Sequence, residues 1–529
     1  MTPGSTPSPP TNADTPTAQQ RDAATTIYER SVPGRRAAIL PPAGVPEPPL
    51  EELIPKHLLR AEGPSLPEVS EPEIVRHYNR ISRRNFDLDT GPYPLGSCTM
   101  KHNPRLNEKV AALPGHARLH PAQDPKRAQG ALELMWRLER ALSELCGLPH
   151  VSLQPSAGSH GELAGLLLTR AYHTDRGEQR TKVLTPDTAH GTNPATVTMS
   201  GYEVVKVATD ECGGVDLDDL SAKATDEIAS LMLTNPNTLG LFDQNIAEIA
   251  SIVHGVGGTL YYDGANLNAI MGWTRPGDMG FDIVHVNLHK SFSQPHGGGG
   301  PGAGPITVSD RIAPYLPVPR IVRTERSNGS GPSYDLDHSG EKSIGRLRGF
   351  QGNFGVFVRS YAYITSLGGD GLREASETAV LNANYLLARL MAGRAGKHLP
   401  LGFGALSRRR SSGVVEPAYR CMHEFVLTGK PAARELGVKT LDIAKRLLDY
   451  GFHPPTIYFP LLVDEALMFE PTETETRESL DDLAEAIDSI LAEAREDPAI
   501  VCEAPYTTPV RRLDEAAASR RPVIRQRLG

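Results

Sequence analysis

Short apolar runs alternate with stretches of helical periodicity between about residues 128 and 309. The runs that we interpret as strands are residues 182–185, 202–207, 230–233, 259–262 and 282–287. Stretches with helical periodicity lie between several of them, for example residues 161–172 and 244–254. Strands that alternate with helices predict an α/β fold with a mostly parallel sheet covered on both faces. Ligands of such sheets bind in the loops at the carboxyl ends of the strands.

The flanking segments have other patterns, which suggest four parts. We predict a disordered tail over residues 1–26, a wrapping segment over 27–127, a large domain over 128–339 and a smaller α+β domain over 340–529. The tail is rich in Thr, Pro, Ser and Ala and has no apolar stretch typical of a secretory signal. The last part contains strong helical periodicity at residues 441–450 and 479–494.

Composition excludes several classes of function. The chain has 529 residues, 39% of them apolar, and a formal net charge of −8. A net negative charge gives no general attraction to nucleic acid or to an anionic membrane. No apolar run approaches the roughly 20 residues that span a bilayer. The five cysteines are scattered and form no CxxC pair, which is typical of reduced thiols in a cytoplasmic protein.

Lys290 and Asp263 are the first candidates for catalysis. Lys290 follows the apolar run Ile283-Val284-His285-Val286, where a buried amine is costly unless it is paired or covalently used. Desolvation makes such an amine a nucleophile toward a carbonyl. Asp263 follows the run at 259–262, beside Ala265, and suits a protonated ring nitrogen of pyridoxal phosphate (PLP). Taken separately, the lysine can reach solvent from the strand end and the aspartate can form a turn.

Other candidate cofactor ligands occupy neighbouring loops. The run 156–162, which includes Gly158, Ser159 and His160, leads into a helix whose start suits a phosphate. An ordinary helix cap is the alternative. His190, in the loop after 182–185, is positioned to stack on a flat ring, although a lone loop histidine is more often structural. Residues 235–238 offer amides to a phenolic oxygen, or they form a simple turn.

Two further patterns do not predict sites. Residues 297–302 match GxGxxG, but Pro301 interrupts them and no acidic residue follows a strand at the expected distance. His285, His289 and His296 lack the spacing and the acidic or cysteine partners of a metal site. We predict no dinucleotide site and no metal.

The order of phosphate loop, histidine, aspartate and lysine is that of the fold-type I PLP enzymes, the aspartate aminotransferase-like family. Longer motifs resemble more specifically the P-proteins of the glycine cleavage system. They are PLGSCTMKHNP (94–104), HGTNPAT (190–196), DGANLNAIMG (263–272), RPGDMGFDIVHVNLHKSFSQPHGGGGPG (275–302), GNFGVFVR (352–359), CMHEFVLTGK (421–430) and GFHPPTIYFPLLVDEALMFEPTETET (451–476). The resemblance runs from about residue 27 to 514. It matches the C-terminal, catalytic half of these proteins, which many bacteria make as a separate second subunit.

The resemblance implies decarboxylation of glycine and transfer of the aminomethyl group to the lipoyl arm of H-protein. It implies that Lys290 forms the Schiff base, that Asp263 keeps the ring nitrogen protonated and that His190 stacks on the ring. Ser159, His160 and His289 would then hold the phosphate, with Asn287 nearby.

Selectivity for glycine would come from a small pocket, with Thr192, Asn193 and residues 296–300 as candidate walls. A companion subunit 1 in an α2β2 heterotetramer is also implied.

Two alternatives belong to other classes of function. One is a different PLP enzyme, an amino-acid decarboxylase or an aminotransferase, which would act without H-protein. The other is a non-catalytic assembly subunit, against which the presence of both Lys290 and Asp263 argues.

Overall fold

The computed structural model describes residues 25–295, 302–325, 331–403, 408–409, 415–416 and 420–525. Nearly all of the predicted tail, residues 1–26, lies outside the described residues. The chain divides into two compact units. One comprises residues 91–502, and the other comprises residues 1–90 with 503–529. No described helix is long and apolar enough to cross a membrane.

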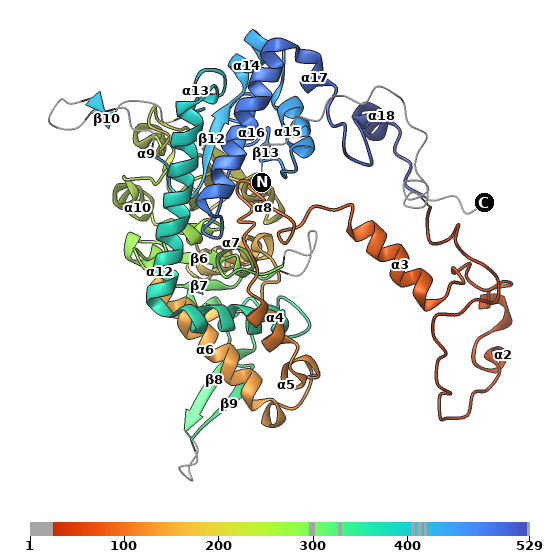
Figure 1. Cartoon of the computed structure of the whole chain (residues 1–529). Helices are drawn as coiled ribbons and strands as arrows, with labels where there is room; N and C mark the ends of the chain where they lie inside the picture. Colours follow the sequence, from red (N-terminus) through yellow and green to blue (C-terminus); the bar gives the residue numbers. More distant parts are fainter. Residues whose placement is uncertain are drawn as a thin grey trace. The chain divides into compact units, whose positions relative to one another are not determined.

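A seven-stranded sheet forms the centre of the larger unit (Figure 1). Its strands are β1 (His150–Ser152), β2 (Lys182–Pro186), β3 (Glu203–Val207), β4 (Ile228–Thr234), β5 (Thr259–Gly264), β6 (Ile283–Val286) and β7 (Ile306–Val308). They lie in the order β1-β7-β6-β5-β4-β2-β3. The neighbours from β3 to β6 are parallel, whereas β7 is antiparallel to β6 and β1 is antiparallel to β7. The predicted α/β fold with a mostly parallel sheet is confirmed.

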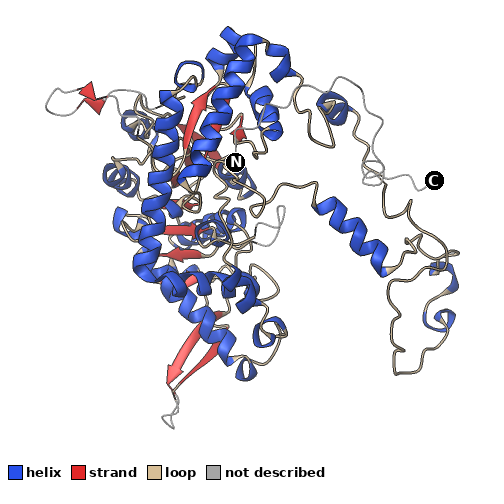
Figure 2. Cartoon of the chain, in the orientation of Figure 1, coloured by secondary structure: helices blue, strands red, loops and turns tan. Residues whose placement is uncertain are grey.

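Helices cover both faces of this sheet (Figure 2). The central strands β4 and β5 are buried throughout. Because successive side chains of a strand point to opposite faces of the sheet, they enter opposite layers. Leu260 and Tyr262 pack into one core with four helices, whereas Tyr261 packs into the other core with two. The first group contains α6 (Gln129–Cys146), α9 (Leu217–Lys223), α10 (Ile246–Gly255) and the beginning of α12 (Phe354–Ala392); the second contains α7 (Gly158–Asp175) and α8 (Thr192–Met199).

The long helix α12 joins the sheet to a second core. Gly368 interrupts the helix with φ 66° and ψ −176°, a conformation that glycine adopts without strain. Side chains before and just after this kink, such as Phe357, pack on the sheet, and later ones, such as Leu387, pack into the second core. One helix therefore connects a core on one face of the main sheet with the second core, which surrounds a smaller sheet.

A three-stranded antiparallel sheet forms the second core, in the order β12-β14-β13. Its strands are β12 (Phe425–Thr428), β13 (Thr456–Ile457) and β14 (Ala466–Phe469). The helices of this region are α13 (Ala395–His398), α14 (Lys430–Leu436), α15 (Thr440–Asp449), α16 (Arg477–Glu496) and α17 (Pro498–Cys502). The helices predicted at 441–450 and 479–494 correspond to α15 and α16.

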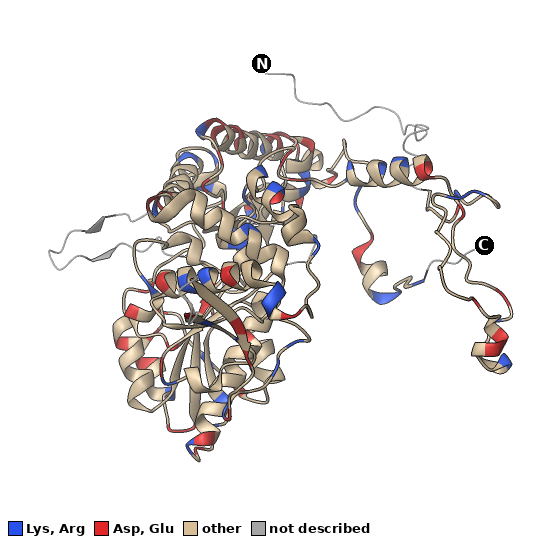
Figure 3. Cartoon of the chain, turned by 90° about the horizontal axis from the view of Figure 1, so that it is seen from below, with Lys and Arg blue, Asp and Glu red and all other residues tan. Residues whose placement is uncertain are grey.

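Smaller elements complete the larger unit. They are α4 (Arg105–Ala111), α5 (Pro114–Ala117), the hairpin of β8 (Arg320–Glu325) and β9 (Pro332–Asp337), the strands β10 (Arg408–Arg409) and β11 (Val415–Glu416), and the 3-10 turns η2 (Pro125–Arg127), η3 (Leu267–Ala269), η4 (Pro276–Met279) and η5 (Ala313–Tyr315). Basic and acidic residues are both spread over the helices of the larger unit (Figure 3).

The smaller unit contains little regular structure. Its elements are α2 (Leu50–Leu53), η1 (Lys56–Leu58), α3 (Glu71–Ser82) and α18 (Glu515–Arg520). Glu68 organises its N-terminal part, because Val32 N–H donates to the Glu68 carbonyl at 2.9 Å and Gly34 N–H donates to its carboxylate at 2.7 Å. Many large apolar side chains here are exposed, including Ile39 at 86% and Val523 at 92%.

Candidate functional site

Asp263 and Lys290 lie at the carboxyl ends of neighbouring parallel strands. Asp263 is the fifth residue of β5, and Lys290 follows the adjacent strand β6. The strand predicted over residues 282–287 corresponds to β6, which ends at Val286. Lys290 belongs to the one-turn helix α11 (Leu288–Ser291) that follows it. The Asn287 carbonyl accepts hydrogen bonds from the Lys290 and Ser291 amides, which turns the chain out of the sheet.

The buried carboxylate of Asp263 is held by three groups. Asn193 Nδ2 donates to Oδ2 at 3.0 Å, and the Ala265 amide donates to Oδ1 at 3.0 Å. His285 Nε2 lies 3.3 Å from Oδ1, and its Nδ1 lies 2.7 Å from the Tyr261 hydroxyl. Burial alone would raise the pKa of Asp263, but His285, these hydrogen bonds and Lys290 outweigh it and lower the pKa. Asp263 is therefore an anion prepared for a cationic partner.

A hydrogen-bonded chain connects His190 with the buried Glu162 of α7. His190 Nδ1 lies 2.9 Å from Thr192 Oγ1, which donates to Glu162 Oε1 at 2.7 Å. Thr196 Oγ1 donates to the other carboxylate oxygen at 3.1 Å. Burial, and then the nearby charge of Asp263, raises the pKa of Glu162 to about 7. The His190 ring is thereby fixed in orientation, and burial lowers its pKa.

The predicted phosphate loop forms the first turn of α7. Gly158 begins the helix, and a Cβ at this position would lie 2.3 Å from Asn287 Oδ1. The half-buried His160 ring has Nδ1 3.1 Å from Ser156 Oγ, whereas Ser159 is exposed. Backbone N–H groups at a helix start favour an anion. The structure thus brings the helix start and the Asn287 side chain together.

The loop after Lys290 packs on the same helix start. A Cβ on Gly302 would lie 2.4 Å from His289 Nδ1, and one on Gly304 would lie 2.1 Å from the Ala157 carbonyl oxygen. Residues 296–301, which include the predicted glycine-rich wall of the pocket and His296, lie outside the described residues.

Residues 97–102, which the sequence patterns did not assign to the site, contact Lys290 and the residues that follow it. Lys290 Nζ donates to the Ser97 carbonyl at 2.7 Å. The buried Lys101 donates to the Ser291 carbonyl at 3.0 Å, and the Ser293 hydroxyl donates to the His102 carbonyl. The run at 94–104 was recognisable only through its resemblance to the P-proteins. Its unusual content of small and polar residues was the one available signal.

The amides of the 235–238 run are used within their own loop. Asn235 Oδ1 accepts from Asp243 N–H at 2.9 Å. Asn237 donates to the Gly213 carbonyl at 2.6 Å and accepts from the amides of Leu239 and Leu241. Both side chains therefore maintain the conformation of the loop after β4.

A further group of titratable side chains was not anticipated. His423, Glu424 and Glu470 are all fully buried, and their potential ligand atoms lie within 4.8 Å of one another. His285, which was considered only as a metal ligand, instead contacts Asp263. The absence of a metal stays a prediction.

The residues at the strand ends fit PLP by their chemistry. Lys290 supplies a primary amine, Asp263 supplies an anion, and the start of α7 supplies backbone donors beside glycines that leave no room for a side chain. An amine, a carboxylate and a phosphate cradle are the groups that a PLP site requires.

Several solved structures have a similar fold. A structure described as glycine decarboxylase (P-protein) of the glycine cleavage system, in inhibitor-bound form, matches with a TM-score of 0.67 and 21% identity, over 83% of this chain and 94% of that chain. A NifS-like protein matches with a TM-score of 0.55 and 15% identity, over 76% and 99% of the two chains. The fold is that of the fold-type I PLP-dependent enzymes.

Comparison with sequence relatives identifies the family of this chain. Residues 375–504 match the family model described as "Glycine dehydrogenase, C-terminal domain". A protein named "Probable glycine dehydrogenase (decarboxylating) subunit 2" from Caldanaerobacter subterraneus is 53% identical over 500 residues, which cover 94% of this chain and 98% of that protein. The protein of the same name from Halalkalibacterium halodurans is 54% identical, over 94% and 97%. The chain belongs to the family of glycine dehydrogenase (decarboxylating) subunit 2, the second P-protein subunit of the glycine cleavage system.

Proposed function

We propose that this chain decarboxylates glycine with PLP held on Lys290 and passes the aminomethyl group to the lipoyl arm of H-protein. The observation that carries the proposal is the position of Lys290 beside an anionic Asp263 at the carboxyl ends of β5 and β6. The alternative of a purely structural subunit does not explain why a buried carboxylate is kept ionised next to a lysine.

Lys290 would hold the cofactor through a covalent imine. Asp263 would accept a hydrogen bond from the protonated ring nitrogen, and Asn193, Ala265 and His285 would keep its carboxylate oriented. His190 would stack on the ring, because the Thr192 hydroxyl fixes its orientation.

The phosphate would be held at the start of α7. The candidate ligands are the Gly158 amide, Ser159, His160 and His289, with the Asn287 side chain nearby. Their support is the helix start, whose backbone donors favour an anion, and the close approach of Asn287 to Gly158.

When bound, PLP supplies a ring that accepts the electrons left on the glycine carbon by departing CO2. Selectivity for glycine would come from exclusion, because glycine has no side chain to bind. Asn193, which is fully buried, and Thr192 are candidate walls, and both are already fixed by hydrogen bonds to acidic side chains. A side chain larger than hydrogen would have to displace these bonded groups.

The relatives' name implies a subunit 1 partner, and we propose an α2β2 heterotetramer with it. The smaller unit supports a partner of this kind, because it exposes large apolar side chains such as Ile39, Leu40 and Ile524 by more than four-fifths. Exposed apolar surface of this kind is typical of obligate interfaces, which bury on the order of 2,000 Å² or more. The free thiols of Cys98, Cys146, Cys212 and Cys421 are in keeping with a cytoplasmic location.

Two experiments test the proposed function. Borohydride reduction of the PLP-loaded protein followed by peptide mapping should place the pyridoxyl group on Lys290, and an adduct on another lysine would refute the assignment. Exchange of labelled bicarbonate with the glycine carboxyl group should require H-protein and subunit 1. Full activity of the lone chain as a homodimer would contradict the proposed assembly, and amino-acid decarboxylation without H-protein would favour a different PLP enzyme.

A further inference from the structure

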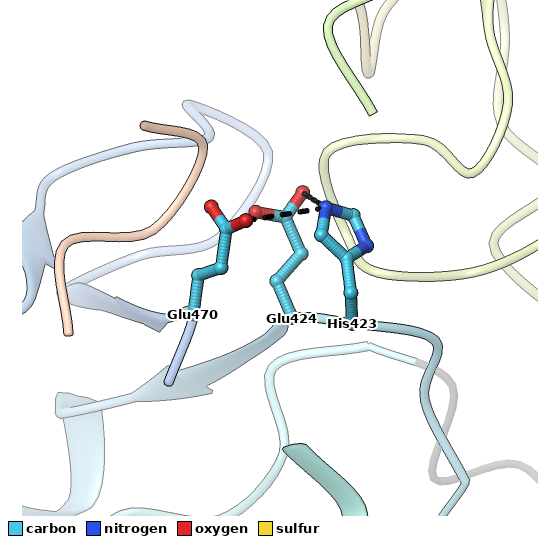
Figure 4. A group of neighbouring side chains, drawn as sticks. All are labelled: His423, Glu424 and Glu470. Carbon is cyan, nitrogen blue, oxygen red and sulfur yellow. Dashed lines mark ion pairs between the residues drawn. The ribbon is translucent and has the colours of Figure 1, made fainter. Parts of the chain in front are cut away.

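Two buried glutamates lie at the end of a strand pair in the second core. Glu424 precedes β12 and Glu470 follows β14, and the register of these strands places the two residues side by side. Figure 4 shows that the His423 ring points toward both carboxylates. His423 Nε2 lies 3.9 Å from Glu424 Oε1 and 3.8 Å from Glu470 Oε1.

All four carboxylate oxygens of this pair accept hydrogen bonds. Glu424 accepts from Ser97 N–H at 2.8 Å and from Asn266 Nδ2 at 3.2 Å. Glu470 accepts from Thr99 N–H at 2.8 Å and from the Thr99 hydroxyl at 2.6 Å. The second core therefore holds the loop of residues 97–99 through two adjacent carboxylates.

The conformation of this loop depends on such restraints. Ser97 has φ 63° and Thr99 has φ 49°, both in the left-handed region that costs free energy for residues other than glycine. Gly96 lies so close to β14 that a Cβ would be 2.8 Å from the Met468 carbonyl oxygen. The loop is thus fixed against β14 and strained where it meets the glutamates.

The strained loop presents the Ser97 carbonyl to Lys290 Nζ at 2.7 Å. We propose that Glu424 and Glu470 are positioning residues, which hold the 97–99 loop so that the Ser97 carbonyl receives the Lys290 amine whenever that amine is not bonded to the cofactor. The proposal rests on the proposed function, since it takes Lys290 as the cofactor lysine. It assigns to the second core a part in releasing that lysine.

A bound cation is the competing explanation for a histidine and two glutamates in one buried group. The geometry disfavours it, because each carboxylate oxygen already has a donor. Burial, and then the positive charges of Lys290 and Lys101, lowers the pKa of His423 to about 3.

The proposal predicts how the loop acts on substrate binding. Binding of glycine to the cofactor would free the Lys290 amine, so a partner for that amine, such as the Ser97 carbonyl, would stabilise the glycine-bound state. Removing a hydrogen bond between the glutamates and the 97–99 loop should therefore raise the dissociation constant for glycine, by about tenfold for one hydrogen bond of this kind. The amount of bound PLP and kcat at saturating glycine should change much less.

The test uses the PLP-loaded protein with its partner subunit, titrated with glycine while the visible absorbance is followed. Thr99→Val removes the hydroxyl bonded to Glu470 and keeps the β-branched shape, and Glu424→Gln and Glu470→Gln remove one acceptor oxygen each. Glu139→Gln is the matched control, because Glu139 is a buried glutamate of α6 with its pKa raised by burial to about 8. Thr99→Val, Glu424→Gln and Glu470→Gln should each bind glycine more weakly than the unmodified protein. The control Glu139→Gln should bind glycine as tightly as the unmodified protein.

Two results would overturn the inference. One is an unchanged glycine dissociation constant in Thr99→Val, which is the variant that alters the loop least. The other is one tightly bound metal ion per chain that is lost in His423→Ala. An adduct mapped away from Lys290 would instead overturn the proposed function itself, so the two failures are distinguishable.

Discussion

The ammonium group of Lys101 lies 3.0 Å from the carbonyl oxygen of Ser291, the residue that follows Lys290. The same group pairs with Glu473 at 2.6 Å, and both side chains are nearly inaccessible, at 1% and 9% exposure. A buried ion pair thus supports the end of α11. Lys101 therefore helps to position Lys290, the proposed cofactor lysine.

Lys101→Met should destabilise the protein strongly. The variant leaves Glu473 buried without its cation, and breaking a buried pair from one side costs about 3–5 kcal/mol. The measurement is the urea concentration at the midpoint of unfolding, compared between Lys101→Met and a control variant. Lys430→Met is the matched control, because the Lys430–Asp464 pair is 71% and 72% exposed and should contribute little. Equal midpoints would contradict the role given to Lys101.

Asp263→Asn should bind PLP but turn over on the order of a hundredfold more slowly, since a neutral amide cannot stabilise a protonated ring nitrogen. The low pKa of Asp263 in its present surroundings predicts that the carboxylate is charged throughout the neutral range. The rate of glycine–bicarbonate exchange at saturating glycine is the measurement. A near-native rate would show that the negative charge is not needed.

Glu162→Gln should make stability less dependent on pH. The pKa of Glu162 is raised to about 7 from 4.5, so the protonated form is favoured in the folded state. Its stabilising contribution is complete below about pH 4.5 and is lost as the pH rises through 7, by on the order of 2–3 kcal/mol. Glutamine has no proton to lose. The free energy of unfolding of the variant should therefore fall less between pH 5 and 8 than that of the unmodified protein. Parallel curves of unfolding free energy against pH would show that the pKa of Glu162 is not raised.

Gly304→Ala should weaken PLP binding and lower the melting temperature. A Cβ at this position would lie 2.1 Å from the Ala157 carbonyl oxygen. Because the contact is between two backbone segments, it can be relieved only by moving one of them. Gly255→Ala provides the control, because a Cβ at the end of α10 meets nothing within 4 Å and alanine favours a helix. If both variants retained PLP equally, the tight packing at the start of α7 would be irrelevant to the site.

Sequence pattern predicted five of the seven strands of the main sheet and missed the short strands β1 and β7. Apolar runs with helices between them predicted β2 to β6, and the position after a run predicted Asp263 and Lys290. The partner of Asp263 was within reach as well. In the register of β5 and β6, Asp263 lies opposite His285, so aligning the two runs as neighbours would have paired these residues.

The contacts of Lys290 were not predictable in this way. Ser97 and Thr99 meet Glu424 and Glu470 across more than 300 residues of chain. No local periodicity encodes such a contact, because it depends on how the second core docks against the sheet. Asn193 was named only as a pocket wall, and its bond to Asp263 required the three-dimensional arrangement of α8 and β5.

The antiparallel strand β7 has a consequence for folding order. The chain must return beside β6 after Lys290, and only then does Gly304 N–H reach the Pro155 carbonyl, at 3.0 Å, next to the start of α7. These residues are 149 positions apart in the sequence, and contacts between such distant segments form late. Uptake of the cofactor during refolding would then mark completion of the sheet, and a fragment that ends before Gly304 would have the proposed cofactor lysine and the start of α7, but not the backbone that packs against it.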